Sequence, residues 1–176
     1  FVDSDDWLES NMCEVLWNLA IKNSADMVIC PFFSENCDTG LHEEDAWGSN
    51  LPFPAKYEQK VFSYKDLSEK EIVWENAPVT AWNKLYHMGF IRKNELRFEE
   101  NCRYEDNAFY YKALILAERI SFTQEKLYHY RINRRGSLQN SSSLNQNVFD
   151  SIPALYSIKE FLIANKVSLG IVNYAT

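Results

Sequence analysis

The first ten residues, FVDSDDWLES, place three aspartates within four positions, after two apolar residues and before a tryptophan and a leucine. Carboxylates this close repel one another, so solvent, the amides of a helix N-terminus or a cation must offset the repulsion. Phe1 and Val2 are typical of the last residues of a buried strand. Asp3 and Asp5 would then lie at the carboxyl end of a strand, where open α/β sheets bind their ligands.

Two interpretations of these aspartates stay open at this point. In one, Asp5 or Asp6 caps the helix that follows, and the other carboxylates are solvated. In the other, Asp3 and Asp5 hold a divalent metal, because Mg²⁺ and Mn²⁺ prefer oxygen ligands and often use one or two carboxylates plus substrate phosphates. A calcium-binding EF-hand loop does not fit, because Trp7 stands where that loop needs a ligand.

Composition limits the class of partner. The 176 residues suit one domain or a domain and a half, and 46% apolar residues supply a substantial core. The net charge of −7 disfavours nucleic acid as a partner, so an anionic ligand would need a local basic cluster or a bridging metal. No apolar run reaches the ~18–20 residues of a membrane span, and the acidic N-terminus is unlike a signal peptide.

The four cysteines show no spacing typical of a metal site, because no Cys-x-x-Cys occurs and no histidine lies close to a cysteine. We therefore expect reduced, mostly buried thiols in a cytosolic protein. The residues in question are Cys13, Cys30, Cys37 and Cys102.

Apolar periodicity predicts an α/β chain. Leucine and valine recur at helical spacing after Asp6, and Pro153 suits the first turn of a last helix. The polar stretch 34–60 predicts a long loop with a hairpin. The pattern predicts helices over residues 6–22, 64–72, 104–117 and 151–165, strands over 27–33, 119–122 and 126–132, and a second loop over 133–147.

Several short motifs then follow in a fixed order, and together they resemble bacterial family-2 glycosyltransferases of the inverting, GT-A type. The first motif, the Asp-x-Asp of the opening stretch, resembles the one that these enzymes use with nucleotide sugars. The resemblance covers residues 1–140. Its further pieces are Trp82-Asn83-Lys84-Leu85-Tyr86, Leu96-Arg97-Phe98, Tyr104-Glu105-Asp106, Leu127-Tyr128-His129-Tyr130-Arg131 and Ser137.

The resemblance implies a partial GT-A (nucleotide-diphospho-sugar transferase) α/β fold that lacks most of the N-terminal nucleotide-binding half. Residues 1–140 would form the metal- and acceptor-binding part of the catalytic domain, and residues 141–176 a C-terminal helical extension. No Q-x-x-R-W stretch of the processive synthases occurs, which favours an enzyme that adds a single sugar.

The resemblance also assigns roles to the acidic residues. Asp5 would coordinate Mg²⁺ or Mn²⁺, and Asp3 would join the metal or contact the sugar or ribose. The metal would stabilise the leaving diphosphate as a Lewis acid. Asp106 would be the base that deprotonates the acceptor hydroxyl, and Glu105 would orient or bind the acceptor. A helix start with two favourable acidic residues is the plainer interpretation of that pair.

The same resemblance implies the remaining site residues. The donor diphosphate would be bound by Asp3, Lys84, Arg131, Arg134 and Arg135, since guanidinium groups pair well with phosphate oxygens. A solvated basic turn is the alternative for the arginines. Trp82 would bind the acceptor or belong to the core. His87, His129 and Trp47 have weaker functional claims.

The intact enzyme would transfer a sugar from a nucleotide-sugar donor to a hydroxyl of a glycan or lipid-linked acceptor, in cell-surface polysaccharide biosynthesis. It would act in the cytoplasm, at the inner face of the membrane, with peripheral membrane association and a homodimer through an exposed sheet edge as further expectations. Two alternatives stay open: a phosphatase of haloacid-dehalogenase type with Asp3 as nucleophile and Asp5 as acid/base, and a non-catalytic binding module.

Overall fold

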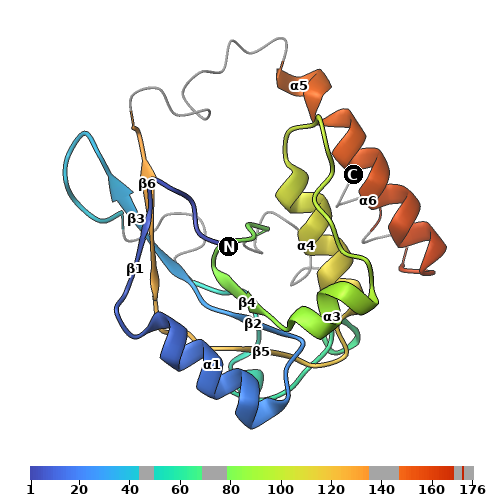
Figure 1. Ribbon diagram of the computed structural model, residues 1–176, viewed down its shortest axis with the longest axis horizontal. Helices are drawn as coiled ribbons and strands as arrows, with labels where there is room; N and C mark the ends of the chain where they lie inside the picture. Colours follow the sequence, from blue (N-terminus) through green and yellow to red (C-terminus); the bar gives the residue numbers. More distant parts are fainter. Residues whose placement is uncertain (44–49, 69–78, 135–146, 169–171, 173–176) are drawn as a thin grey trace.

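The computed structural model describes residues 1–43, 50–68, 79–134, 147–168 and 172. Its helices and strands are interspersed along the chain, as expected for an α/β fold (Figure 1). The strands are β1 (Trp7–Leu8), β2 (Met27–Ile29), β3 (Phe32–Asn36), β4 (Lys84–Tyr86), β5 (Ile120–Phe122) and β6 (Tyr128–Ile132). The α-helices are α1 (Met12–Asn23), α3 (Met88–Lys93), α4 (Glu105–Leu116), α5 (Asn147–Asp150) and α6 (Ile152–Ala164), with 3-10 turns at Ala55–Tyr57 and Tyr64–Asp66.

The strands form two small sheets. In the order β4-β2-β5, the central β2 runs antiparallel to β4 and parallel to β5. In the order β1-β6-β3, the central β6 runs antiparallel to β1 and parallel to β3. Because β2 and β3 follow each other closely in the chain, the two sheets are held side by side.

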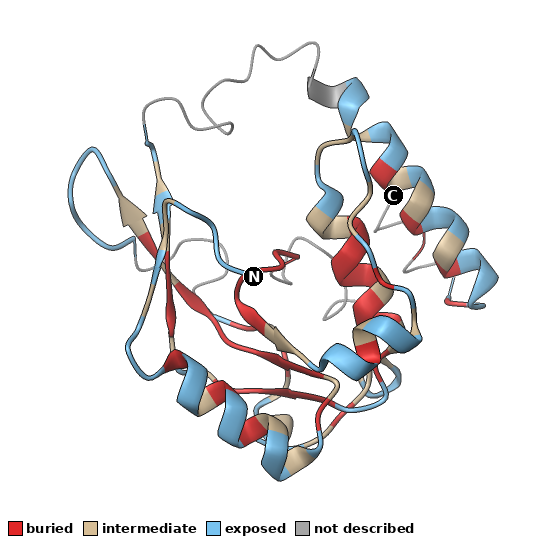
Figure 2. Cartoon of the chain, viewed as in Figure 1, coloured by how far each residue is buried: buried red, intermediate tan, exposed pale blue. Residues whose placement is uncertain are grey.

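Helices cover both faces of these strands (Figure 1). Successive side chains of a strand point to opposite faces, and β2 shows this alternation clearly. Val28 packs with α1 in one apolar cluster, whereas Met27 and Ile29 pack with α4, β5 and α6 in the other. Figure 2 shows the result: β2, β5 and most of α4 are buried, while α1 and α6 each keep an exposed outer face.

Several elements differ from the sequence-based prediction, two of them close to the N-terminus. The strand predicted over 27–33 is two strands in different sheets, because it breaks at Cys30 and Pro31 between β2 and β3; proline has no amide hydrogen to donate to a ladder. The helix predicted over 6–22 starts at Met12, because Trp7 and Leu8 pair with β6 instead. Asp6 is therefore not the helix cap, and Asn11 takes that position.

Other predictions are confirmed. Helix α4 and strands β5 and β6 lie close to their predicted ranges, and α6 has its proline in the first turn. The hairpin expected in the long loop is present as a bridge between Glu35 and His42.

The helix predicted over 64–72 is a 3-10 turn at Tyr64–Asp66, and residues 69–72 lie outside the described residues.

Two expectations of burial are wrong. Phe1 and Val2 are exposed and belong to none of the described strands, so Asp3 and Asp5 precede β1 and do not follow a strand end. The Phe1 ring nevertheless packs edge-on against Tyr86 and Phe109. Cys13 and Cys37 are exposed as well, whereas Cys30 is buried as expected. No helix in the described ranges is both long enough and apolar enough to cross a membrane.

Candidate active site

The three N-terminal aspartates lie in the turn that leads into β1, and Asp6 fixes this turn to β6. Its carboxylate accepts the backbone N–H of Arg131 and the hydroxyl of Tyr128, each at 2.9 Å. The same hydroxyl accepts the backbone N–H of Asp3 at 3.1 Å, and the turn is closed by the N–H of Asp6, which donates to the carbonyl of Asp3. Asp6 therefore holds the other two aspartates in place.

Asp3 and Asp5 differ in their surroundings: Asp3 lines a cavity, and Asp5 forms an ion pair. Burial, and then the negative charges of Asp5 and Glu105, raise the pKa of Asp3 above its ordinary value. Asp5 pairs with the guanidinium of Arg134 at 2.9 Å, in a contact that is partly open to solvent. A cation placed between Asp3 and Asp5 would relieve the repulsion from Asp5, which is a smaller cause than burial.

The second acidic pair opens helix α4. Glu105 is exposed, and Asp106 is half-buried and accepts the N–H of Asn107 at 2.9 Å. Burial, and then the charge of Glu105, raise the pKa of Asp106 to about 6, against the smaller lowering effects of the Asn107 hydrogen bond and of Lys84. A carboxylate that titrates near neutrality suits a general base.

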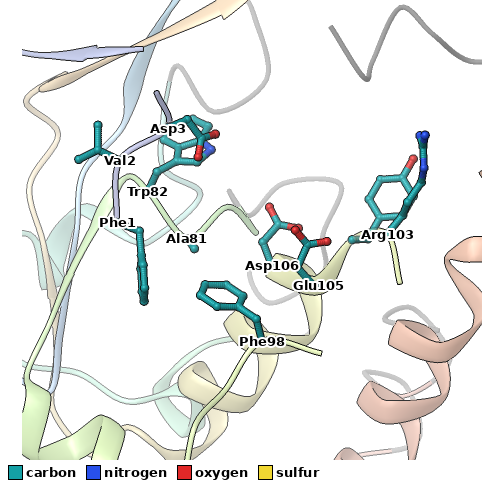
Figure 3. A pocket seen from close by; sticks show the side chains of 10 residues that line it. Phe1, Val2, Asp3, Ala81, Trp82, Phe98, Arg103, Glu105 and Asp106 are labelled. Atoms are coloured by element: carbon teal, nitrogen blue, oxygen red, sulfur yellow. The ribbon is translucent and has the colours of Figure 1, made fainter. Parts of the chain in front are cut away.

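One cavity of about 750 Å³ joins these two acidic groups. Pockets of this size are typical of small-molecule sites. Figure 3 shows Asp3 above Trp82 on one side of it, with the carboxylates of Glu105 and Asp106 opposite and Arg103 beyond them. Its lining residues are Phe1, Val2, Asp3, Ala81, Trp82, Phe98, Arg103, Tyr104, Glu105 and Asp106.

Trp82 belongs to the core as well as to the cavity wall. Its side chain is only 6% exposed. The indole stacks on Tyr128 with ring centroids 4.2 Å apart, and on Tyr130 with centroids 5.0 Å apart. The core interpretation offered by the sequence is therefore confirmed for Trp82, which also lines the cavity, and its contact with an acceptor stays a prediction.

Lys84 lies beneath the cavity and not in it. It is 3% exposed, and its ammonium donates to the carbonyl of Thr80 and to Oδ1 of Asn83, with the Tyr110 ring 4.9 Å away. Burial lowers the pKa of Lys84 to about 7, against the opposing effects of Cys30 and Asp106. Direct contact with a donor diphosphate, the role implied for it by resemblance, does not fit this burial, whereas an electrostatic influence on Asp106 does.

The arginines occupy different places. Arg134 faces the aspartate turn through Asp5, and the Arg131 guanidinium lies 5.0 Å from the centre of the Trp7 ring. Arg135, predicted to bind the diphosphate, lies outside the described residues, as do Ser137 and Trp47.

The two histidines named by the sequence are packed. His129 is stacked between Trp7 and Phe33, and its ring nitrogens lie 2.5 Å from Glu35 and 2.9 Å from Glu9. His87 caps α3 by accepting the N–H of Phe90. These contacts account for both side chains without a ligand.

A divalent metal at this site would need some of its ligands from a substrate. Within the described ranges, no three histidine, cysteine, aspartate or glutamate side chains gather into a group that could hold a metal. Asp3 and Asp5 offer two hard oxygen donors, which fits Mg²⁺ or Mn²⁺ when phosphate oxygens and water complete the coordination. These residues therefore suit a metal that arrives with a diphosphate.

Sequence reasoning missed three contributors to the site. Tyr128 connects Asp3 to Asp6, and Arg103 and Tyr104 complete the far wall of the cavity. The signal for Tyr128 was its place in the Leu127-Tyr128-His129-Tyr130-Arg131 motif, in which the family resemblance assigns a donor-binding role only to Arg131. Arg103 and Tyr104 directly precede the acidic pair, so their adjacency to Glu105 was the signal that could have found them.

Comparison with known proteins connects this geometry to glycosyl transfer. Over 138 residues the chain is 31% identical to the "Glycosyltransferase GlyA" of Streptococcus pneumoniae, which covers 78% of this chain and 19% of that protein. Over 159 residues it is 31% identical to the "Putative glycosyltransferase EpsH" of Bacillus subtilis, covering 89% of this chain and 42% of that protein. The relatives of this chain are glycosyltransferases. No protein-family model matches the chain.

A third relative and a solved structure extend this result. The chain is 29% identical over 150 residues to the "Cholesterol galactosyltransferase" of Borreliella burgdorferi. It superposes on Staphylococcus aureus TarS 1–349 in complex with UDP-GlcNAc with a TM-score of 0.66 and 18% identity, over 96% of this chain and 43% of that one. The expected α/β fold, a partial GT-A-like fold, is thereby confirmed. The chain spans less than half the length of each of these proteins.

Proposed function

We propose that the chain forms the metal- and acceptor-binding part of a glycosyltransferase. The reaction is transfer of a sugar from a nucleotide-sugar donor to a hydroxyl of a glycan or lipid-linked acceptor, with inversion at the anomeric carbon. The main support for the proposal is that Asp3 and Asp106 line a single cavity, although they lie far apart in the sequence. We assign residues 1–140 to this part and residues 141–176 to a helical extension.

The donor would bind at the aspartate turn. Asp3 and Asp5 would hold Mg²⁺ or Mn²⁺, which as a Lewis acid supplies charge stabilisation to a leaving diphosphate. Arg134, which already reaches the Asp5 carboxylate, is positioned to contact the same phosphate oxygens. The likeness of the fold to TarS, which was crystallised with UDP-GlcNAc, supports a nucleotide sugar as the donor.

The acceptor hydroxyl would be activated by Asp106. Its carboxylate takes the proton of the hydroxyl while the acceptor oxygen forms its bond to the anomeric carbon. The bond from that carbon to the phosphate oxygen breaks, and the electron pair leaves with the nucleotide diphosphate. Burial and the nearby charge of Glu105 make the Asp106 carboxylate more basic than an exposed one, which favours this proton transfer.

The setting follows from the substrates. Nucleotide sugars are cytoplasmic, so we propose a cytoplasmic enzyme that meets its acceptor at the inner face of the membrane in polysaccharide biosynthesis. The name of the Borreliella relative, a cholesterol galactosyltransferase, supports a lipid acceptor as an alternative to a glycan. The absence of a Q-x-x-R-W stretch from the sequence favours the addition of a single sugar.

Calorimetry on the natural chain that carries this sequence tests the proposal. UDP-, GDP- and dTDP-sugars are titrated into the folded protein with and without Mn²⁺. We expect binding of one donor that requires the metal and is lost in Asp5→Asn. Asp38→Asn is the matched control, because Asp38 is an exposed aspartate in the turn after β3, away from the cavity lining. A folded protein that binds none of the donors in the presence of Mn²⁺ contradicts the proposal.

A further inference from the structure

Tyr104 has a backbone conformation that a tyrosine rarely adopts. It precedes Glu105 and Asp106 as the N-cap of α4, with φ 61° and ψ 32° in the left-handed region. Side chains with a Cβ are disfavoured there, and asparagine and glycine tolerate it best. Of the described residues with positive φ, Tyr104 is the one aromatic residue; the other non-glycine ones are Ser24, Gln59, Glu95, Asn101, Asn133 and Lys166.

Helix stability does not explain a tyrosine at this position. Its side chain forms no capping hydrogen bond, and the residues that cap helices well are serine, threonine, aspartate and asparagine. Core packing does not explain it either, because the residue is 55% exposed. Strained residues that persist without a structural benefit cluster at ligand sites.

The position of Tyr104 in the cavity indicates which ligand it meets. Figure 3 shows the carboxylates of Glu105 and Asp106 between Asp3 on one side and Arg103 on the other, and Tyr104 lines the cavity next to Arg103. In an inverting transfer the acceptor attacks from the face opposite the leaving diphosphate. With the diphosphate at Asp3, the acceptor lies on the Asp106 side of the cavity, where Arg103 and Tyr104 also form the wall.

The wall that holds Tyr104 is anchored. The backbone N–H of Arg103 donates to the carbonyl of Asp150 at 3.0 Å, which connects this segment to α5. On the other side, Tyr104 continues directly into the buried helix α4. An exposed aromatic ring between two fixed points loses little conformational entropy when a ligand packs on it.

We propose that Tyr104 is the acceptor platform of this site: its ring stacks against the apolar C–H face of the acceptor sugar and sets that sugar's hydroxyl toward Asp106. The ligand class is therefore a pyranose ring at the acceptor end, whether its aglycone is a further sugar or a lipid. This inference rests on the proposed glycosyltransferase function, and it adds a specificity-determining residue to it.

The test uses the natural chain and three probes: octyl β-glucoside, octyl β-galactoside and octyl β-N-acetylglucosaminide, all below their micelle concentrations. Binding is measured by saturation-transfer NMR in the presence of diamagnetic Mg²⁺ and the nucleoside diphosphate of the donor. We expect Tyr104→Asn to weaken binding of the preferred glycoside about fivefold or more, and Tyr104→Phe to leave it within about twofold. Donor affinity should be unchanged in both variants.

Thermal unfolding separates a binding role from a structural one. Asparagine tolerates the left-handed conformation, so the Tm of Tyr104→Asn should stay at or above that of the unmodified protein. Tyr156→Asn is the matched control, because Tyr156 is an exposed tyrosine on α6. We expect that substitution to leave glycoside binding unchanged.

The outcomes distinguish this proposal from the one it rests on. A protein that binds no nucleotide sugar contradicts the glycosyltransferase function itself. A protein that binds its donor but none of the three glycosides, or whose Tyr104→Asn variant binds them equally well, overturns the platform alone. A Tm that falls together with glycoside binding assigns Tyr104 a structural role and also overturns it.

Discussion

The hydroxyl of Tyr128 donates to the carboxylate of Asp6 at 2.9 Å and accepts the backbone N–H of Asp3 at 3.1 Å. Burial and its aspartate neighbours raise the pKa of this phenol well above the ordinary range, so it stays protonated as a donor. One side chain from β6 therefore fixes both ends of the turn that carries Asp5.

Replacing Tyr128 with phenylalanine removes this connection and little else. We expect it to lower the free energy of unfolding by about 1–2 kcal/mol, because Asp6 loses one hydrogen bond and keeps the N–H of Arg131. The free energy of metal-dependent donor binding should decrease by more than the free energy of unfolding does, since the turn becomes free to move. Urea unfolding and calorimetry measure the two effects.

Tyr130→Phe is the control for that variant. It makes the same chemical change two residues along β6, at a ring that also stacks on Trp82. Equal losses of donor binding in the two variants would contradict the assignment of this role to the Tyr128 hydroxyl.

The sequence did not predict strand β1 in this region, and the reason is specific. Asp6-Trp7-Leu8 continues the helical spacing of α1, so local pattern favoured a longer helix. Trp7 instead pairs with His129, which is distant in the sequence, and this pairing overrides that preference. Periodicity reports local structure, and a two-residue strand that depends on such a distant partner leaves no periodic signal.

The same contrast holds within the candidate site. Asp3, Asp5, Glu105 and Asp106 were predicted from short motifs, because the two members of each pair are adjacent or separated by one residue. Other features of the site depend on packing and backbone geometry. These are the burial of Lys84 under the cavity, the stacking of Trp82 on tyrosine and the left-handed conformation of Tyr104. The sequence contains those residues but not their orientation.

Arg134 and Arg131 should differ in function although both are basic residues of the same stretch. Arg134 pairs with Asp5, and we expect Arg134→Ala to weaken donor binding about tenfold or more, since a guanidinium–phosphate contact is lost. Stability should change by about 0.5 kcal/mol, because the pair is partly solvent-exposed. Calorimetry with the donor and thermal unfolding provide the two measurements.

Arg131→Ala supplies the comparison. Its guanidinium lies over Trp7, so we expect a smaller effect on donor binding. Should Arg131→Ala weaken the donor more than Arg134→Ala does, the diphosphate lies on the Trp7 side of the turn.

The rate of transfer should depend on the ionisation of Asp106. A base must be deprotonated, and the pKa of this carboxyl is raised to about 6, chiefly by burial. We therefore expect log kcat/KM to rise with pH and to level off above about 6. A profile that stays flat between pH 5 and 8 in the unmodified enzyme would exclude Asp106 as the base.

Stability should show the opposite dependence. Because the folded pKa of Asp106 exceeds its ordinary value of 3.8, the folded state binds more protons than the unfolded state between about pH 3.8 and 6, and this contribution to stability is lost as pH rises through that window. At pH 7.5 we expect Asp106→Asn to abolish transfer and to raise the free energy of unfolding by about 2 kcal/mol. Urea unfolding of both proteins at pH 5 and 7.5 measures the difference, which should shrink at the lower pH.

Lys84 should act on Asp106 through its charge. The buried ammonium lowers the pKa of Asp106, so Lys84→Met should move the acid limb of the rate profile to higher pH. The variant should also remove a pH dependence of stability. The folded pKa of Lys84 is about 7 against 10.5 ordinarily, so the unfolded state binds more protons between these values and stability rises with pH across them. Lys126→Met is the control, because that lysine lies over the Phe33 ring and does not line the cavity. An unchanged acid limb in folded Lys84→Met would show that Lys84 serves only to hold Thr80 and Asn83 in place.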